Sequence, residues 1–94
     1  MVKLIARLRA RPGQEELVAD ALRTLAAPSR EEAGCREYVP CQAKDDPAAL
    51  LVLEEWESQA ALDAHMQTPH FEAFLAEVGE ALAGEPQLEL IERL

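Results

Sequence analysis

The spacing of apolar residues changes several times along the chain, and this change constrains the fold more than any other feature. In residues 2–10, apolar and charged side chains alternate, which is the period of a β-strand with one buried face. From Gln14 onward, apolar residues recur every three or four positions, as in an amphipathic helix. The same criteria predict further strands and helices, namely strands at 35–42, 50–56 and 88–94 and helices at 58–66 and 69–82.

The expected order of elements is strand, helix, strand, strand, helix pair, strand. This βαββαβ order predicts an α+β fold of the ferredoxin-like type, in which helices cover one face of a four-stranded antiparallel sheet. No linker, repeat or low-complexity segment divides the sequence. We therefore interpret residues 1–94 as a single domain.

The length of the chain also bears on its assembly. A domain of 94 residues has a thin core, because a small domain buries a smaller fraction of its surface than a large one. The sheet face away from the helices should therefore be covered as well. We expect this face to carry Ile5, Leu50, Val52 and Ile91, or their alternates, and to pack on the sheet of a second copy. The predicted assembly is a homodimer joined sheet to sheet.

Prolines and short polar residues set the expected element boundaries. Pro28 should kink or interrupt the first helix, because it cannot donate a hydrogen bond to the carbonyl of Thr24. Pro40 indicates that the second strand lies at a sheet edge or contains a bulge. Ser58 and Thr68 are typical N-cap residues and predict where the two later helices begin.

The charge of the chain excludes two classes of partner. Eighteen acidic and nine basic residues give a net charge of −9, so phosphate backbones and anionic membranes should repel the protein. No apolar run approaches the ~20 residues that a membrane span needs. The opening segment breaks at Arg7, before it could form the apolar centre of a secretion signal. We expect a cytoplasmic protein that binds neither nucleic acid nor membrane.

The two cysteines are expected to be packed and unpaired. Cys35 and Cys41 fall in one predicted strand, where six residues separate them by about 20 Å. A disulfide requires Cα atoms within about 7 Å, so they cannot pair there. Neither has the short spacing of a zinc knuckle or a redox pair.

The only two histidines, His65 and His70, lie in the segment ALDAHMQTPHF. Five-residue spacing places them about 140° apart on an ideal helix, and no third ligand stands out, so we expect no metal site. His65 shares a helix face with Leu62 and Met66 and should point inward. From the residues alone, it is either a packed core histidine or the proton acceptor of an apolar cleft.

Several segments of the chain resemble a known family in order and in spacing. They are PGQEEL, REEAGCREY, DDP, LVLEEW, AALDAHMQTPHFEAF and LELIE. The family that they resemble is the antibiotic biosynthesis monooxygenase superfamily, including its small bacterial quinol monooxygenases. The most specific part is Glu54-x-Trp56, followed by His65 and then TPHF.

The resemblance implies a dimeric α+β barrel, with a pocket between the helices and the sheet of each subunit. It also implies oxidation of a quinol, anthrone or other phenol by O₂, without flavin, metal or any other cofactor. The partners would then be a small aromatic substrate and O₂. A histidine that titrates near neutral pH suits the role of the base. The resemblance makes His65 the base or orienting group, with His70 as the second catalytic candidate.

The same resemblance implies a set of substrate-contacting residues. Trp56 and Phe74 would form walls for the substrate rings. Glu54 would either orient a histidine or close a structural hydrogen bond. The full expected set of substrate-contacting residues is Trp56, Phe74, Phe71, Met66 and Glu54.

The chain departs from two branches of the superfamily. Haem-degrading members use an Asn, a Trp and a His, and the corresponding positions here hold Ala6, His65 and Leu75. Haem degradation is therefore not expected. Polyketide-oxidising members use Asn, Trp and Tyr side chains, of which only a Trp is shared, which argues against a role in an antibiotic pathway.

Two other functions stay open from the sequence. A different branch isomerises a phosphorylated, sugar-like quorum signal and carries a similar pair of histidines. That reaction would need cations for the phosphate, which Arg7, Arg9 or Arg36 could supply if they faced the pocket. The other alternative is a non-catalytic dimer that binds a small molecule and whose histidines only pack.

Overall fold

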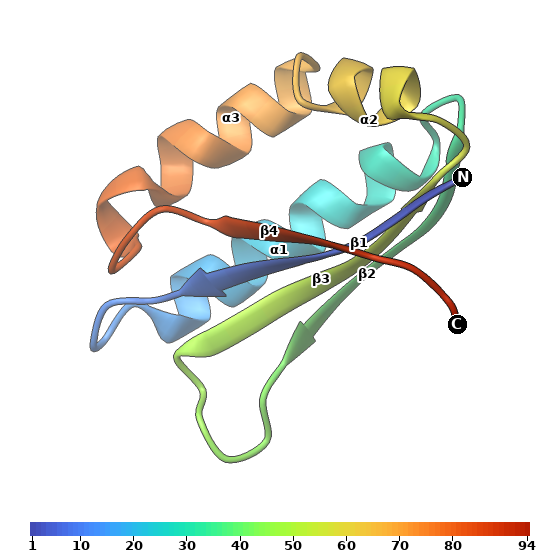
Figure 1. The fold of residues 1–94 in the computed structure, drawn as a ribbon. Helices are drawn as coiled ribbons and strands as arrows, with labels where there is room; N and C mark the ends of the chain where they lie inside the picture. The colour runs from blue at the N-terminus through green and yellow to red at the C-terminus, as the bar shows by residue number, and fades with distance from the viewer.

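The computed structural model describes all residues from 1 to 94, and it has the predicted element order. Its four strands form one antiparallel sheet in the order β2-β3-β1-β4 (Figure 1). The strands are β1 (Val2–Arg9), β2 (Cys35–Gln42), β3 (Ala49–Trp56) and β4 (Gln87–Ile91). The ferredoxin-like α+β architecture is thus confirmed, and β2, which contains Pro40, lies at an edge as predicted.

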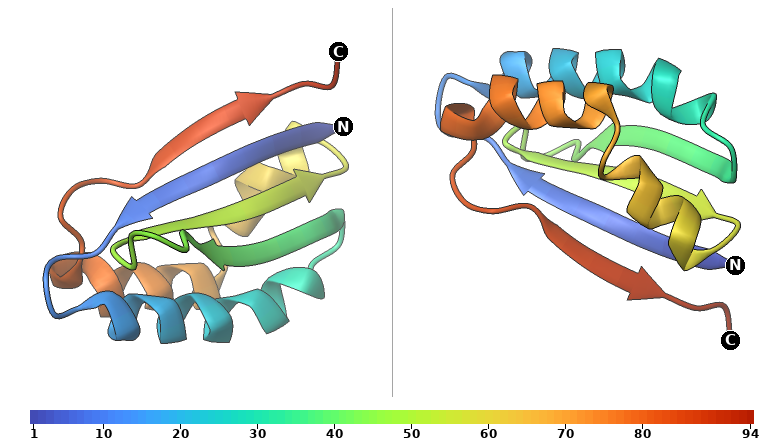
Figure 2. Two further views of the ribbon diagram at one scale, coloured as in Figure 1. Left: turned by 90° about the horizontal axis from the view of Figure 1, so that it is seen from below. Right: turned by 90° about the horizontal axis from the view of Figure 1, so that it is seen from above.

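The helices lie together on one face of this sheet (Figure 2). They are α1 (Glu15–Arg30), α2 (Gln59–His65) and α3 (Pro69–Val78), and the 3₁₀ turn η1 (Gly79–Ala81) follows α3 directly. The predicted N-caps are confirmed. The Ser58 side chain accepts a hydrogen bond from the Ala61 N–H, and the Thr68 side chain accepts one from the Phe71 N–H. These two caps mark the starts of α2 and α3, and the histidines lie at the end of α2 and in the first turn of α3.

Of the two effects expected of Pro28, a kink or an interruption, the interruption is wrong, because α1 continues to Arg30. Pro28 falls in the last turn, so the hydrogen bond that it cannot donate is one of the last in the helix. Beyond it, the Glu31 N–H donates to the Pro28 carbonyl, which keeps the chain helical to its end. The helix then stops at a turn that contains Gly34, with a φ of 87°.

The core lies between the helices and the inward face of the sheet. Ala6 pairs with Val52 and Leu8 pairs with Leu50, and all four side chains are buried under the helices. Of the residues named for the outward face, Leu50 and Val52 therefore lie on the inward one, and the expectation holds only for their alternates. Directly opposed residues of an antiparallel pair point to the same face, and the register places these two opposite inward residues of β1.

The outward face carries the alternates of those two residues. Ile5 pairs with Leu53, which pairs in turn with Val39 on β2, and Ile91 pairs with Lys3. Val39, Leu53 and Ile91 are each more than a third exposed. The predicted apolar character of this face is present, although it comes from a different set of β3 residues.

Two further expectations concern the cysteines and the membrane. Cys35 and Cys41 are both free, as predicted. None of the helices combines the length and the apolar character that crossing a bilayer would require.

Candidate functional site

An apolar cavity of about 150 Å³ lies between the helices and the inward face of the sheet. Its walls are mostly aliphatic and aromatic, and its ionisable side chains are Tyr38, Glu54 and His65. At one end it is bordered by Leu75, Pro86 and Leu88, which are exposed. This end faces β4, which no helix covers (Figure 2). The cavity thus has a mostly apolar interior and an apolar mouth.

His65 is the last residue of α2 and is almost completely buried. Its ring packs between aromatic side chains, with centroid distances of 4.7 Å to Trp56, 5.0 Å to Phe71 and 5.2 Å to Tyr38. Three rings on different elements hold the imidazole in one orientation. The prediction that His65 points inward is confirmed.

The two ring nitrogens of His65 have different surroundings. Nδ1 lies 2.7 Å from Oε2 of Glu32, whereas Nε2 is buried and has no hydrogen-bond partner. An ionised carboxylate can only accept hydrogen bonds, so the proton of a neutral His65 lies on Nδ1. Nε2 then keeps a free lone pair, and His65 is one of the residues that line the cavity; a free lone pair is what a base requires.

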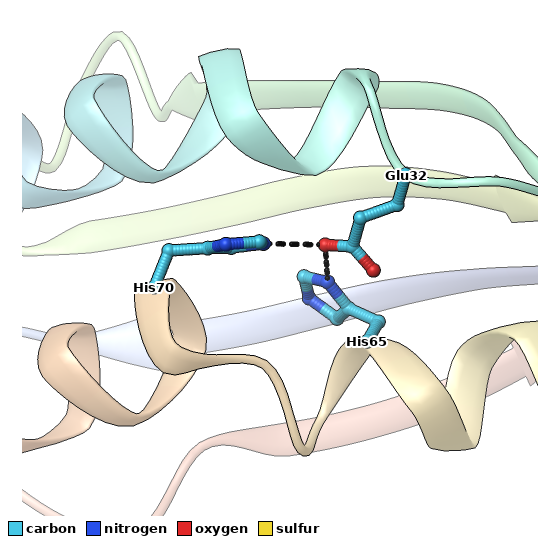
Figure 3. Close-up of side chains that lie close together, drawn as sticks. All are labelled: Glu32, His65 and His70. Carbon is cyan, nitrogen blue, oxygen red and sulfur yellow. Dashed lines mark hydrogen bonds and ion pairs between the residues drawn. The ribbon is translucent and has the colours of Figure 1, made fainter.

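Glu32 joins both histidines through a single oxygen atom (Figure 3). Its Oε2 lies 2.7 Å from Nδ1 of His65 and 2.6 Å from Nε2 of His70. His70 comes from the first turn of α3, and Glu32 comes from the turn after α1. Three separate elements therefore meet at one carboxylate.

Gly34 allows this turn to approach α2. A Cβ atom at position 34 would lie 2.7 Å from the Cβ of Ala61, which is closer than real side chains come. The positive φ of Gly34 is also a conformation that other residues rarely adopt. The glycine thus brings the backbone next to Glu32 against the helix that carries His65.

Burial and charge oppose each other at His65. Burial lowers the pKa of the imidazole, because the charged form loses its hydration. The hydrogen bond and the negative charge of Glu32 raise the pKa again, but burial is the larger effect. His65 is therefore neutral near pH 7 and able to accept a proton.

Glu54 is a second ionisable group on the cavity wall, and it is 5% exposed. Burial raises the pKa of this carboxyl from 4.5 to about 7. The hydrogen bond that it accepts from Nε1 of Trp56, at 3.0 Å, lowers the pKa in part. Of the two roles expected for Glu54, the structure has the structural hydrogen bond and not the contact with a histidine.

The structure distributes the predicted site residues over three places. His65, Met66, Phe71, Phe74 and Glu54 line the cavity. His70 reaches the site through Glu32 and is not among the lining residues. Trp56 is completely buried behind the His65 ring and is not among them either.

Two residues of the site were given no role by the sequence. Tyr38 lines the cavity, and burial raises the pKa of its hydroxyl, which therefore stays protonated. Glu32 lies 33 positions from His65 and 38 from His70, so no local spacing connects them. Its only signal was its place in the family-like segment REEAG.

The donor atoms of Glu32, His65 and His70 all lie within 4.8 Å of one another and could hold a metal ion. The expectation of no metal site rested on the five-residue spacing of the histidines and on the lack of a third ligand. Glu32 is a candidate for that ligand.

Comparison with known proteins gives a family and a fold. The family model described as antibiotic biosynthesis monooxygenase matches residues 1–77. The protein named probable quinol monooxygenase YgiN, from Escherichia coli, is 36% identical over 95 residues, covering 90% of this chain and 88% of its own.

Solved structures agree with this result. PA3566 from Pseudomonas aeruginosa is 39% identical with a TM-score of 0.90, covering 99% of this chain and 93% of its own. Rv0793 from Mycobacterium tuberculosis is 32% identical with a TM-score of 0.89, covering 99% and 94%. The similarity thus runs nearly from end to end.

Proposed function

Because this chain belongs to the antibiotic biosynthesis monooxygenase family, we propose that it oxidises a quinol or related phenol with O₂, without a bound cofactor. YgiN, its relative from Escherichia coli, bears the name of a probable quinol monooxygenase. The family supplies the class of reaction. The residues that line the cavity indicate which side chain is the base and what size of substrate fits.

The observation that carries the proposal is the buried, unpartnered Nε2 atom of His65, a residue that lines the cavity. A buried nitrogen without a hydrogen bond costs folding free energy of about 1–3 kcal/mol. A substrate hydroxyl in the cavity would supply the missing partner. Glu32 holds the opposite nitrogen, which keeps the accepting lone pair directed at the substrate.

The reaction begins when the phenolic proton moves to Nε2 of His65 and leaves an electron-rich quinolate. The quinolate transfers an electron to O₂, and the two radicals combine to form a bond between a ring carbon and oxygen. The ring carbon then loses its hydrogen as a proton, and the electron pair of that C–H bond forms a C=O bond as the O–O bond breaks. One oxygen atom stays on the ring, and the other takes up this proton and the proton held by His65 and leaves as water. Quinol and O₂ thus give a hydroxyquinone and water, with all four electrons supplied by the substrate.

The protein assists this reaction through proton removal and through its environment. Removing the proton makes the substrate its own reductant. The apolar walls exclude water from the radical pair. The negative charge of Glu32 stabilises the imidazolium that forms on His65.

The size of the cavity favours a substrate with one ring inside. An apolar cavity of about 150 Å³ holds a molecule the size of benzene, and the volume here is about 150 Å³. A larger substituent would leave through the mouth at Leu75 and Leu88. We therefore favour a one-ring quinol, with any apolar tail directed toward β4, over a three-ring anthrone.

The isomerase alternative lacks a cation for the substrate phosphate. Arg7 pairs with Glu89 and Arg9 pairs with Asp46. Neither arginine lines the cavity, and the exposed Arg36 does not line it either. A phosphorylated substrate would therefore enter a cavity whose wall carries the carboxyl group of Glu54 and no lysine or arginine.

We also propose that the protein acts as a homodimer joined through the outward sheet face. Exposed Val39, Leu53 and Ile91 on this face support a second copy as the cover. The net charge of −9 argues against nucleic acid in that role. Sedimentation at micromolar concentration should give twice the mass of a 10.4 kDa chain, and a single-chain mass would contradict the dimer.

The decisive test measures oxygen consumption with a panel of one-ring quinols in the presence of ¹⁸O₂. We expect one labelled oxygen in the product and a fall in kcat of about a hundredfold or more in His65→Ala. Gln67→Ala is the matched control, because this exposed residue lies two positions away. Uptake that does not exceed autoxidation, with no loss in His65→Ala, would remove the oxygenase proposal.

Two further arms separate the alternatives. Turnover of a phosphorylated dihydroxyketone under nitrogen would favour the isomerase. Quinol binding without turnover, at an affinity unchanged in His65→Gln, would leave only a binding function.

A further inference from the structure

The cluster of Glu32, His65 and His70 contains more ligand atoms than a base requires. Proton removal needs one carboxylate on Nδ1 of His65. The structure adds a second imidazole, whose Nε2 lies 2.6 Å from the same carboxylate oxygen. Three donor atoms from three elements thus converge within 4.8 Å (Figure 3).

We propose that these three side chains form a binding site for a late first-row divalent cation, such as Zn²⁺, and that the bound cation switches off the base at His65. The binding half of this inference is independent of the reaction. The inhibitory half rests on the proposed function, because it requires His65 to act as the base.

The donor set is the first argument for this site. Two imidazole nitrogens and one carboxylate oxygen are common protein ligands of open zinc sites, where water or another molecule takes the fourth position. Ligand atoms at about 2.1 Å from a tetrahedral ion lie about 3.4 Å apart. The two contacts to Glu32 Oε2 are 2.7 and 2.6 Å, so each has to open by about 0.7–0.8 Å when the ion replaces the protons.

The exposure of the three side chains shows which of them can make this movement. His65 is 2% exposed and is held between aromatic rings. Glu32 and His70 are 13% and 26% exposed, so both border the solvent. A small rotation of these two would open the site, and the same side gives access to the ion and to a water ligand.

A bound ion would change which nitrogen of His65 carries the proton, and this determines whether His65 can act as a base. An ion bound at Nδ1 takes the lone pair of that nitrogen and displaces its proton. A neutral imidazole ligated at one nitrogen carries its proton on the other. The proton of His65 would then lie on Nε2, and this nitrogen would be a donor, unable to accept a proton from the substrate.

The first test is calorimetric titration of the tag-free full-length protein with ZnCl₂. We expect one site per chain, weakened by about tenfold or more in both Glu32→Ala and His70→Ala. Glu31→Ala is the matched control, because it removes an exposed carboxylate one position away. Circular dichroism and thermal unfolding of each variant show whether it is folded, and Co²⁺ absorption in the wild type gives a second measure of binding.

The second test identifies the ligating atoms and does not depend on activity. In ¹⁵N side-chain NMR spectra, Zn²⁺ should change the signals of Nδ1 of His65 and Nε2 of His70 as direct ligands. It should also move the remaining proton of His65 to Nε2. Unchanged histidine signals, or equal zinc affinity in the wild type and both ligand variants, would place any bound zinc elsewhere and overturn the site.

A separate activity measurement tests whether the bound cation inhibits the reaction. If the protein consumes oxygen with quinols, stoichiometric Zn²⁺ should reduce kcat by about tenfold or more, and a chelator should restore it. Zinc bound at these nitrogens without loss of kcat would overturn the switch but not the site. If no quinol turns over, the titration and the NMR spectra still decide whether the site exists.

Discussion

Two carboxylates lie near the aromatic cluster around His65, and their surroundings differ. Glu32 is 13% exposed and contacts both histidines. Glu54 is 5% exposed, and its side-chain partner is the Trp56 indole. Glu32 therefore acts on the imidazoles, whereas Glu54 is a buried acid whose own proton is held to about pH 7. The comparison shows that environment, and not residue type, assigns the role of each acid.

The largest expected effect is a pH-dependent change in the free energy of unfolding that is caused by Glu54. Burial raises the pKa of Glu54 from 4.5 to about 7, so the folded protein holds this proton more tightly than the unfolded chain does. The resulting stability is present below pH 4.5 and is lost as pH rises through about 7. The difference between a pKa of 4.5 in the unfolded chain and one of about 7 in the folded protein corresponds to roughly 3 kcal/mol of unfolding free energy.

Urea unfolding between pH 4 and pH 8 measures this effect. Glu54→Gln should remove most of the loss, because an amide keeps an acceptor for Trp56 but does not ionise. Glu55→Gln, one position along on the opposite sheet face, should keep a wild-type slope. The same slope in the wild type and in Glu54→Gln would show that Glu54 titrates normally and would remove the contrast between the two acids.

The second effect is a fall in kcat when Glu32 loses its charge. Glu32→Gln can still accept a hydrogen bond but has no charge to stabilise an imidazolium at His65. We expect kcat with a quinol to fall by about a hundredfold, which corresponds to about 2.7 kcal/mol. Glu31→Gln serves as the control. Wild-type kcat in Glu32→Gln, measured by oxygen uptake, would mean that the carboxylate only packs.

The smallest effect concerns the turn that presents Glu32. Gly34→Ala combines an unfavourable positive φ with a contact to Ala61, and we expect it to cost about 2 kcal/mol. Gly13→Ala is a matched control, because Gly13 has a similar φ but no neighbour within 4 Å. Denaturant unfolding compares the two variants. An equal cost in both would mean that the close approach to α2 does not strain the turn.

Local patterns were sufficient for most of the fold. Alternating residues predicted β1, the caps Ser58 and Thr68 predicted the starts of two helices, and Pro40 predicted an edge strand. These features depend on interactions within a few residues, which sequence spacing describes directly. The interruption at Pro28 failed because the cost of a proline depends on how much helix follows it.

The face assignment of β3 failed for a different reason. Its apolar run includes Leu50, Leu51, Val52 and Leu53, so alternation could not identify the inward set. Only the pairing with β1 decided that Leu50 and Val52 lie under the helices.

By itself, the sequence determined the element order, the position of His65 on the inward face of its helix, and the family. The tertiary structure alone decided that Glu32 meets both histidines, that Trp56 lies behind His65, and that Glu54 binds the indole. The physical reason is range. Periodicity and capping act over a few residues, whereas a shared carboxylate oxygen depends on how three separate elements pack in space.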